Sequence, residues 1–189
     1  MLQPPNWTTL QRRGNDNATQ KYVAFFAEGQ NREAERAAFD AAWGYVCGLP
    51  HGHMIYYYSK YERTIWRQLQ LRFPDVCHAD EIEALYSTTR AIDLYYDIVK
   101  PKTEWPTRDH SIKTLASYLG FRWRDTEPSG AASIEWFNRF AETGDLRIKQ
   151  RILDYNEDDC LATGVVLDAV RQLGLQSLPY ETRCNPGKS

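Results

Sequence analysis

Acidic side chains set among apolar residues are the groups in this sequence that could do chemistry. Along residues 146–173, heptad steps meet only apolar or aromatic side chains except at Asp159, in the middle of the stripe. Tyr155 lies one turn earlier on the same face. A buried, unpaired carboxylate is costly, so Asp159 needs a cation, a cluster of donors or a raised pKa. The alternative is that the helix breaks near Asn156 and that Asp159 caps a second segment.

Two more acids share this character. Glu62 lies one turn before an apolar stripe that starts at Ile65, directly after a predicted strand at residues 53–58. The simpler explanation for Glu62 is that a helix dipole favours an acid in the first turn. Asp93 lies inside the predicted extended segment 91–99, and we expect it to hydrogen-bond a neighbouring loop rather than to hold a metal.

Carboxylates in apolar surroundings near strand ends are typical ligands of a hard divalent cation such as Mg²⁺ or Mn²⁺. Two such ions clamp the attacking and leaving oxygens of a phosphodiester and lower the pKa of the attacking water. The hydroxyl of Tyr155 can orient that water. The other acids of this region, Asp154, Glu157 and Asp158, are expected to be solvated.

The composition is that of a globular protein of one domain. The 189 residues are 42% hydrophobic, 13% aromatic and 25% charged, which excludes a disordered chain, a coiled-coil rod and a collagen-like repeat. The net charge of −2 argues against a module that holds nucleic acid by charge alone. The first residues lack the basic and apolar regions of a signal peptide, and the four cysteines form no Cys-x-x-Cys pair, so we expect a cytoplasmic protein without a membrane span.

Strands and helices are expected to alternate along the chain. Residues 7–13 and 21–28 read as a hairpin around the turn signal at 14–17, and residues 53–58 and 91–99 as further extended segments. Helices are expected at residues 31–46, 61–73, 79–89, after Ser111, at 133–142 and at 146–173. This pattern predicts an α/β domain with a mixed sheet and helices on both faces. We divide the chain into a polar N-terminal segment (1–20), the domain (21–174) and a tail (175–189).

Two motifs carry a resemblance to a known family. Residues 155–159, Tyr-Asn-Glu-Asp-Asp, resemble the Tyr-x-x-x-Asp third motif of the DEDD 3′–5′ exonuclease superfamily, which has an RNase H-like fold. Residues 58–62, Tyr-Ser-Lys-Tyr-Glu, resemble its second motif, Asn-x-x-aromatic-Asp, with Tyr58 in place of Asn and Glu62 in place of Asp. Together with residues 111–115 and Cys160, these motifs are similar to the RNase H-like domain of predicted RecB-family nucleases, and the resemblance covers residues 21–173.

The resemblance implies roles for three residues. Glu62 and Asp159 would be metal ligands for Mg²⁺ or Mn²⁺, and Tyr155 would position the attacking water. The partner would be nucleic acid, DNA or RNA, at a single-stranded end. Such domains often form the C-terminal half of a longer nuclease or helicase polypeptide.

The sequence departs from the family at its first motif, Asp-x-Glu, which supplies two of the four acids. The one acid before Lys21 is Asp16, in a turn. The resemblance therefore implies an RNase H-like mixed sheet flanked by helices that lacks its first, central strand. The chain is then a fragment of a longer product, a product with too late a start, or a natural variant without that strand and without catalysis. We expect a homodimer or a rearranged sheet to cover the open strand edges, and Asp93 or Glu28 stays open as a replacement ligand.

Two functions stay open at this stage. One is a metal-dependent nuclease of the 3′–5′ exonuclease type, and the other is a non-catalytic module that binds nucleic acid or a protein on the same fold. The number of acids discriminates between them, because only Glu62 and Asp159 match the pattern and two ions need more ligands. A third function, a small-molecule enzyme, has no support because the sequence contains neither a phosphate loop nor a nucleophile elbow.

Overall fold

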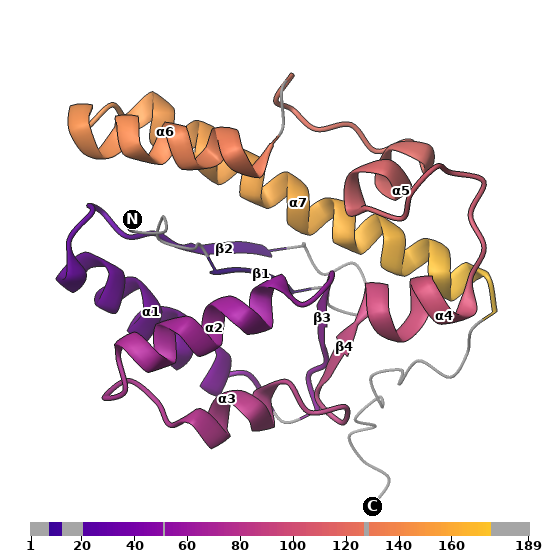
Figure 1. Ribbon diagram of the computed structural model, residues 1–189, viewed down its shortest axis with the longest axis horizontal. Helices are drawn as coiled ribbons and strands as arrows, with labels where there is room; N and C mark the ends of the chain where they lie inside the picture. Colours follow the sequence, from indigo (N-terminus) through magenta and orange to yellow (C-terminus); the bar gives the residue numbers. More distant parts are fainter. Residues whose placement is uncertain (1–7, 13–20, 51, 127–128, 175–189) are drawn as a thin grey trace, which may run out of the picture.

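The computed structural model describes residues 8–12, 21–50, 52–126 and 129–174, and its mixed α/β architecture confirms the predicted fold class (Figure 1). The strands are β1 (Thr8–Arg12), β2 (Lys21–Phe25), β3 (Ile55–Tyr57) and β4 (Ala91–Asp93). The helices are α1 (Arg32–Cys47), α2 (Tyr61–Arg72), α3 (Ala79–Leu85), the π-helix η1 (Leu94–Val99), α4 (Lys100–Lys102), α5 (Ile112–Tyr118), α6 (Gly130–Thr143) and α7 (Leu146–Gln172).

The described strands form two separate pairs rather than one continuous sheet. Strands β1 and β2 are antiparallel with Thr8 opposite Phe25, which confirms the pairing of the predicted hairpin, while its predicted turn lies outside the described residues. Strands β3 and β4 are parallel, with Ile55 opposite Ala91 and Tyr57 opposite Asp93. The carboxyl ends of β3 and β4 therefore meet at the same edge.

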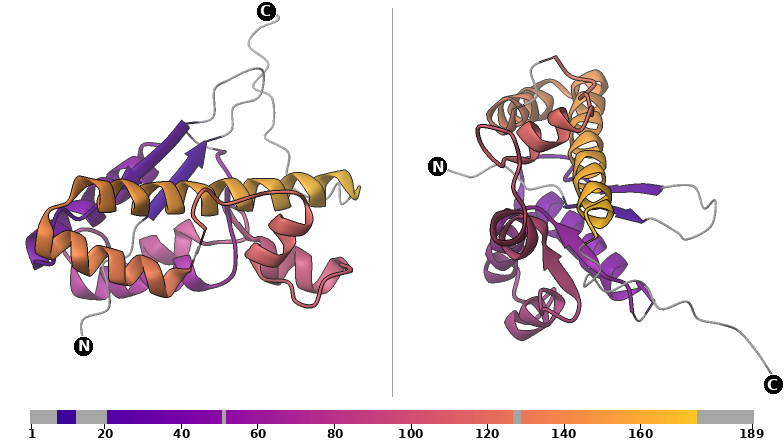
Figure 2. Two further views of the ribbon diagram at one scale, coloured as in Figure 1. Left: turned by 90° about the horizontal axis from the view of Figure 1, so that it is seen from above. Right: turned by 90° about the vertical axis from the view of Figure 1, so that its right-hand side faces the viewer.

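Helices lie on both sides of the β1–β2 pair. In Figure 1, α1, α2 and α3 lie below the strands and α5, α6 and α7 lie above them, and the side view in Figure 2 shows the same separation. Helix α7 runs across the whole molecule, past the hairpin and past the ends of β3 and β4. It is the element that brings residues 155–159 to the parallel strands.

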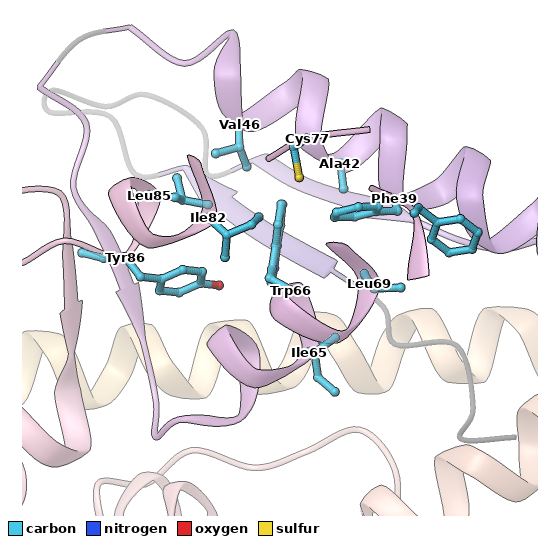
Figure 3. Close-up of a cluster of buried hydrophobic side chains, with 12 residues drawn as sticks. Phe39, Ala42, Val46, Ile65, Trp66, Leu69, Cys77, Ile82, Leu85 and Tyr86 are labelled. Atoms are coloured by element: carbon cyan, nitrogen blue, oxygen red, sulfur yellow. The ribbon is translucent and has the colours of Figure 1, made fainter. Parts of the chain in front are cut away.

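Three apolar clusters hold these elements in place. The first joins α1, α2 and α3 around Trp66, whose ring meets that of Phe39 edge-on with centroids 5.8 Å apart (Figure 3). The second packs β4, η1 and α5 against the C-terminal half of α7 through fully buried residues such as Leu94, Leu115 and Val166. The third packs α6 on the N-terminal half of α7. Burial along its whole length fixes the position of α7 relative to the strands.

The prediction of an extended segment over residues 91–99 is wrong beyond Asp93. The chain turns there into the π-helix η1, because the carboxylate of Asp93 caps the backbone N–H groups of Tyr95 (3.0 Å) and Tyr96 (3.1 Å). The β-branched residues that suggested a strand instead lie in the core, with Ile98 and Val99 almost completely buried, whereas Tyr96 is exposed.

Among the described helices, none combines the length and the apolar character that crossing a bilayer requires.

Candidate active site

The candidate site lies where β3 and β4 end. After β3, Ser59 adopts a left-handed backbone with φ of 74°, an uncommon conformation for a residue other than glycine. The backbone N–H of Ser59 donates to Oδ1 of Asp93 at 2.9 Å, so this tight turn is tied to the end of β4. Three residues later, Glu62 occupies the first turn of α2. The turn thus links the end of β3 to the first turn of α2, where Glu62 lies.

Asp93 is an organising residue at this edge. Its Oδ1 accepts hydrogen bonds from the N–H groups of Ser59, Tyr95 and Tyr96, and the residue is 4% exposed. The predicted bond to a neighbouring loop is confirmed. Burial raises the pKa of Asp93 above its usual value, although these three hydrogen bonds act in the opposite direction.

Glu62 is half-buried, and one oxygen of its carboxylate is fully buried and unsatisfied. Its Oε2 is inaccessible to solvent and has no hydrogen-bond partner. Burial, together with the negative charges of Asp93 and Asp159, raises the pKa of Glu62 to about 7. A solvated acid attracted to a helix dipole would not show this burial, so Glu62 is held here at a cost to stability.

Helix α7 is continuous through the third motif, so the alternative of a break near Asn156 is wrong. Oδ1 of Asp159 accepts a hydrogen bond from the indole N–H of Trp123 at 2.9 Å, and its carboxylate also accepts one from the hydroxyl of Tyr155. Burial raises the pKa of Asp159, while these donors and the nearby ammonium of Lys113 favour its ionised form.

Tyr155 is fixed in place by its ring. It meets the indole of Trp136 edge-on, with centroids 6.1 Å apart, and the ammonium of Lys113 lies 5.1 Å from its ring centroid. Burial, and then the charge of Asp159, raises the pKa of the Tyr155 hydroxyl well above its usual value. This hydroxyl therefore keeps its proton at neutral pH and acts as a hydrogen-bond donor, not as a base.

The prediction that Asp158 is solvated is wrong. Asp158 is 3% exposed, and its carboxylate accepts hydrogen bonds from the backbone N–H (2.7 Å) and Nε (2.9 Å) of Arg124. The same guanidinium pairs with Glu157 and Asp154. Because Trp123 directly precedes Arg124, this ion pair pins the loop that delivers the indole N–H to Asp159.

Sequence reasoning assigned no role to Trp123, Arg124 or Lys113. The available signals were weak: a buried tryptophan needs an acceptor for its indole N–H, and a buried acid needs a cation. Neither signal names the partner, since Trp123 lies 36 residues before Asp159 and Arg124 lies 34 residues before Asp158.

Glu28 is not brought to this site. It is exposed and forms an ion pair with Lys149 at 2.5 Å. Lys149 lies ten residues before Asp159, which is roughly 15 Å along α7. Glu28 is therefore poorly placed to replace a missing ligand beside Asp159.

The charge of Asp159 contributes to the raised pKa of Glu62, so the two carboxylates lie near each other, and together they suit one divalent cation. The unpartnered Oε2 of Glu62 offers a hard oxygen ligand, and Mg²⁺ is commonly held by one or two carboxylates, with waters and substrate phosphates completing its shell. Within the residues that the structure describes, no three Cys, His, Asp or Glu side chains form a cluster able to hold a metal. The acids present fit a single ion better than a pair.

A family model described as RNase H superfamily matches residues 9–171 of this chain. Comparisons with curated proteins and with solved structures give no match.

Proposed function

The chain belongs to the RNase H superfamily, and from this premise we propose that Glu62 and Asp159 form a Mg²⁺- or Mn²⁺-dependent site that hydrolyses phosphodiester bonds. At the level of the family, the match supports a nuclease-like domain that acts on nucleic acid. The motifs at residues 58–62 and 155–159 support a narrower assignment, a 3′–5′ exonuclease-like domain of the DEDD type, as in RecB-family nucleases.

One observation carries this proposal. Oε2 of Glu62 is buried without a partner, at the edge where β3 and β4 end and close enough to Asp159 for the two charges to interact. The carboxylate accepts backbone hydrogen bonds, but its buried Oε2 is left without a partner, which is destabilising unless something else binds there. Keeping this carboxylate is expected where it binds a cation.

The chain's own residues divide the work of hydrolysis. Glu62 and Asp159 would hold the ion, which when bound supplies charge stabilisation and a more acidic water. The protonated hydroxyl of Tyr155 keeps Asp159 oriented and can orient a water beside it. The indole N–H of Trp123 donates to the same carboxylate, and the ammonium of Lys113 adds positive charge that a phosphate oxygen can meet.

A second candidate function is binding without cleavage. It is favoured by the small number of acids, since Asp93 already accepts three backbone N–H groups through Oδ1 and Glu28 is paired elsewhere. Two carboxylates can hold nucleic acid through one bridging cation without assembling the two-ion geometry.

Digestion of a 5′-labelled single-stranded oligonucleotide in Mn²⁺ separates these functions. Stepwise shortening by the wild-type chain that is lost in Asp159→Asn and in Glu62→Gln supports the nuclease. Asp80→Asn serves as the matched control, because Asp80 is exposed in the first turn of α3. No shortening, or equal shortening by all variants, contradicts the nuclease proposal.

The two strand pairs also suggest how the domain assembles. A two-stranded sheet has an outer edge on each strand, and such edges pair readily with other strands. This supports either a homodimer or a neighbouring segment of a longer polypeptide as the partner. Light scattering on the purified chain tests the first: a monomeric mass contradicts the homodimer.

A further inference from the structure

Exposed tyrosine and lysine side chains lie on the segments that follow β3 and β4. Tyr61 is 63% exposed and Tyr96 is 39% exposed. The ammonium of Lys60 lies 4.5 Å from the ring centroid of Tyr96, and that of Lys100 lies 5.6 Å from the same centroid. Lys60 and Tyr61 directly precede Glu62, and Tyr96 contacts both Lys60 and Lys100; we call these four residues the tyrosine–lysine platform.

Asp93 is the residue that assembles this platform. Its Oδ1 binds the N–H of Ser59, which directly precedes Lys60, and also the N–H of Tyr96. The turn before α2 and the π-helix η1 are therefore joined at one atom, and this turn directly precedes Glu62 in the first turn of α2. The same capping that ends β4 early places Tyr96 against Lys60.

The ring of Tyr96 is also supported from behind. It meets the ring of Tyr95 edge-on with centroids 4.8 Å apart, and Tyr95 in turn packs on Tyr58 at 5.7 Å. The hydroxyl of Tyr58 donates to the carbonyl of His110, which ties this row of rings to the chain before α5. A ring held this way loses little further freedom when a ligand stacks on it.

The charges beside the platform suit a polyanion. The nearest acid on η1, Asp97, accepts the N–H of Asp93 at 3.0 Å and is held along the backbone by this bond. Lys60 and Lys100 are exposed and contact an aromatic ring, an interaction that is weak at a surface and readily exchanged. An incoming base can take the ring face while the ammonium groups move to phosphates.

We propose that the tyrosine–lysine platform binds single-stranded nucleic acid by stacking unpaired bases on Tyr61 and Tyr96 and by pairing Lys60 and Lys100 with phosphates. Stacking of this kind is tolerant of sequence and needs bases that are free of a duplex. Because neither rings nor ammonium groups read the 2′-hydroxyl, DNA and RNA single strands bind alike. The inference rests on the proposed function, since it supplies substrate to the Glu62–Asp159 site.

The test is fluorescence anisotropy of a labelled oligothymidylate in EDTA, where neither a cation nor cleavage contributes. Tyr96→Ala and Tyr61→Ala each weaken binding about tenfold, the usual effect of losing one stacked base. Tyr118→Ala is the matched control, because Tyr118 is 56% exposed but meets the ring of Trp105 edge-on instead, and it leaves binding unchanged. Oligouridylate gives the same ranking, and a duplex of equal length binds more weakly than either single strand.

The lysines give a second readout that does not depend on the tyrosine variants folding. Lys60→Gln and Lys100→Gln each reduce the slope of log K against log salt by about 0.7, the value for one phosphate contact on a single strand. Unchanged affinity in all four variants, tighter binding of the duplex, or no binding by the wild-type chain overturns the platform.

Failure of the platform and failure of the nuclease are distinguishable. Tyrosine-dependent binding without digestion in Mn²⁺ supports the platform and contradicts the nuclease. Digestion in Mn²⁺ together with an affinity that does not depend on the tyrosines supports the nuclease and contradicts the platform.

Discussion

Replacing Glu62 with Gln should raise the free energy of unfolding relative to wild type, and this gain should be larger at high pH than at low pH. Burial raises the pKa of Glu62 from the 4.5 usual for a glutamate to about 7 in the folded chain. Between these two values the folded state holds a proton that the unfolded state has lost, so wild-type stability falls as pH rises. At pH above 7 both states are ionised, and the folded state bears the full cost of a buried charge.

The size of this effect follows from the pKa. Each tenfold change in a proton equilibrium is worth about 1.4 kcal/mol, so the raised pKa corresponds to a cost of up to about 3 kcal/mol. The amide of Gln has no such dependence. Urea unfolding at about pH 5 and about pH 8 measures this pH dependence. The contributions of other titrating groups cancel in the difference in unfolding free energy between wild type and Glu62→Gln.

A control variant and a measurement with Mg²⁺ complete the comparison. Glu142→Gln changes an exposed acid of α6 and should run parallel to wild type at both pH values. Mg²⁺ should stabilise wild type but not Glu62→Gln, and more strongly at the higher pH, where the carboxylate is free to bind it. If the stability difference between wild type and Glu62→Gln is the same at both pH values, the burial argument for Glu62 is refuted.

Three more substitutions test the parts that support the site. Arg124→Gln leaves the buried carboxylate of Asp158 without its side-chain partner and should cost about 2 kcal/mol in urea unfolding, whereas a change below about 0.5 kcal/mol would contradict the pinning of this loop. Tyr155→Phe keeps the ring but removes the donor to Asp159; digestion in Mn²⁺ should slow at least about tenfold while stability falls by only about 1 kcal/mol, and an unchanged rate would exclude the hydroxyl from catalysis. Phe137→Ala empties a completely buried position between α6 and α7 and should cost about 3–5 kcal/mol by the same urea measurement, so a near-neutral result would show that α6 contributes little to holding α7.

Patterns within one element predicted most of the fold. Apolar spacing gave the helices at α2 and α7 with boundaries within a residue or two, and Ser111 caps α5 as its position before an apolar helix indicated. The prediction of an extended segment after Asp93 was wrong because it rested on the β-forming side chains and not on the capping carboxylate of Asp93. The cap decides the local conformation, since it satisfies two N–H groups at once.

Only the site residues that lie in sequence motifs or beside apolar stripes were predicted. Glu62 and Asp159 were found because each interrupts or precedes an apolar stripe. Asp158 was misjudged because its burial depends on Arg124, a partner from another element that no periodicity reveals. The hydrogen bond from the indole N–H of Trp123 to Asp159 was not predicted for the same reason. Contacts across elements depend on tertiary packing, whereas spacing in the sequence reports only the face of a single helix or strand.

The central claim, that Glu62 and Asp159 together hold one divalent cation, is tested most directly by titrating the chain with Mn²⁺ at about pH 8 and following free Mn²⁺ by electron paramagnetic resonance. We predict one bound ion per chain in wild type and in Glu142→Gln, and loss of that ion in both Glu62→Gln and Asp159→Asn. Equal binding by all four proteins, or no binding by wild type, would contradict the claim.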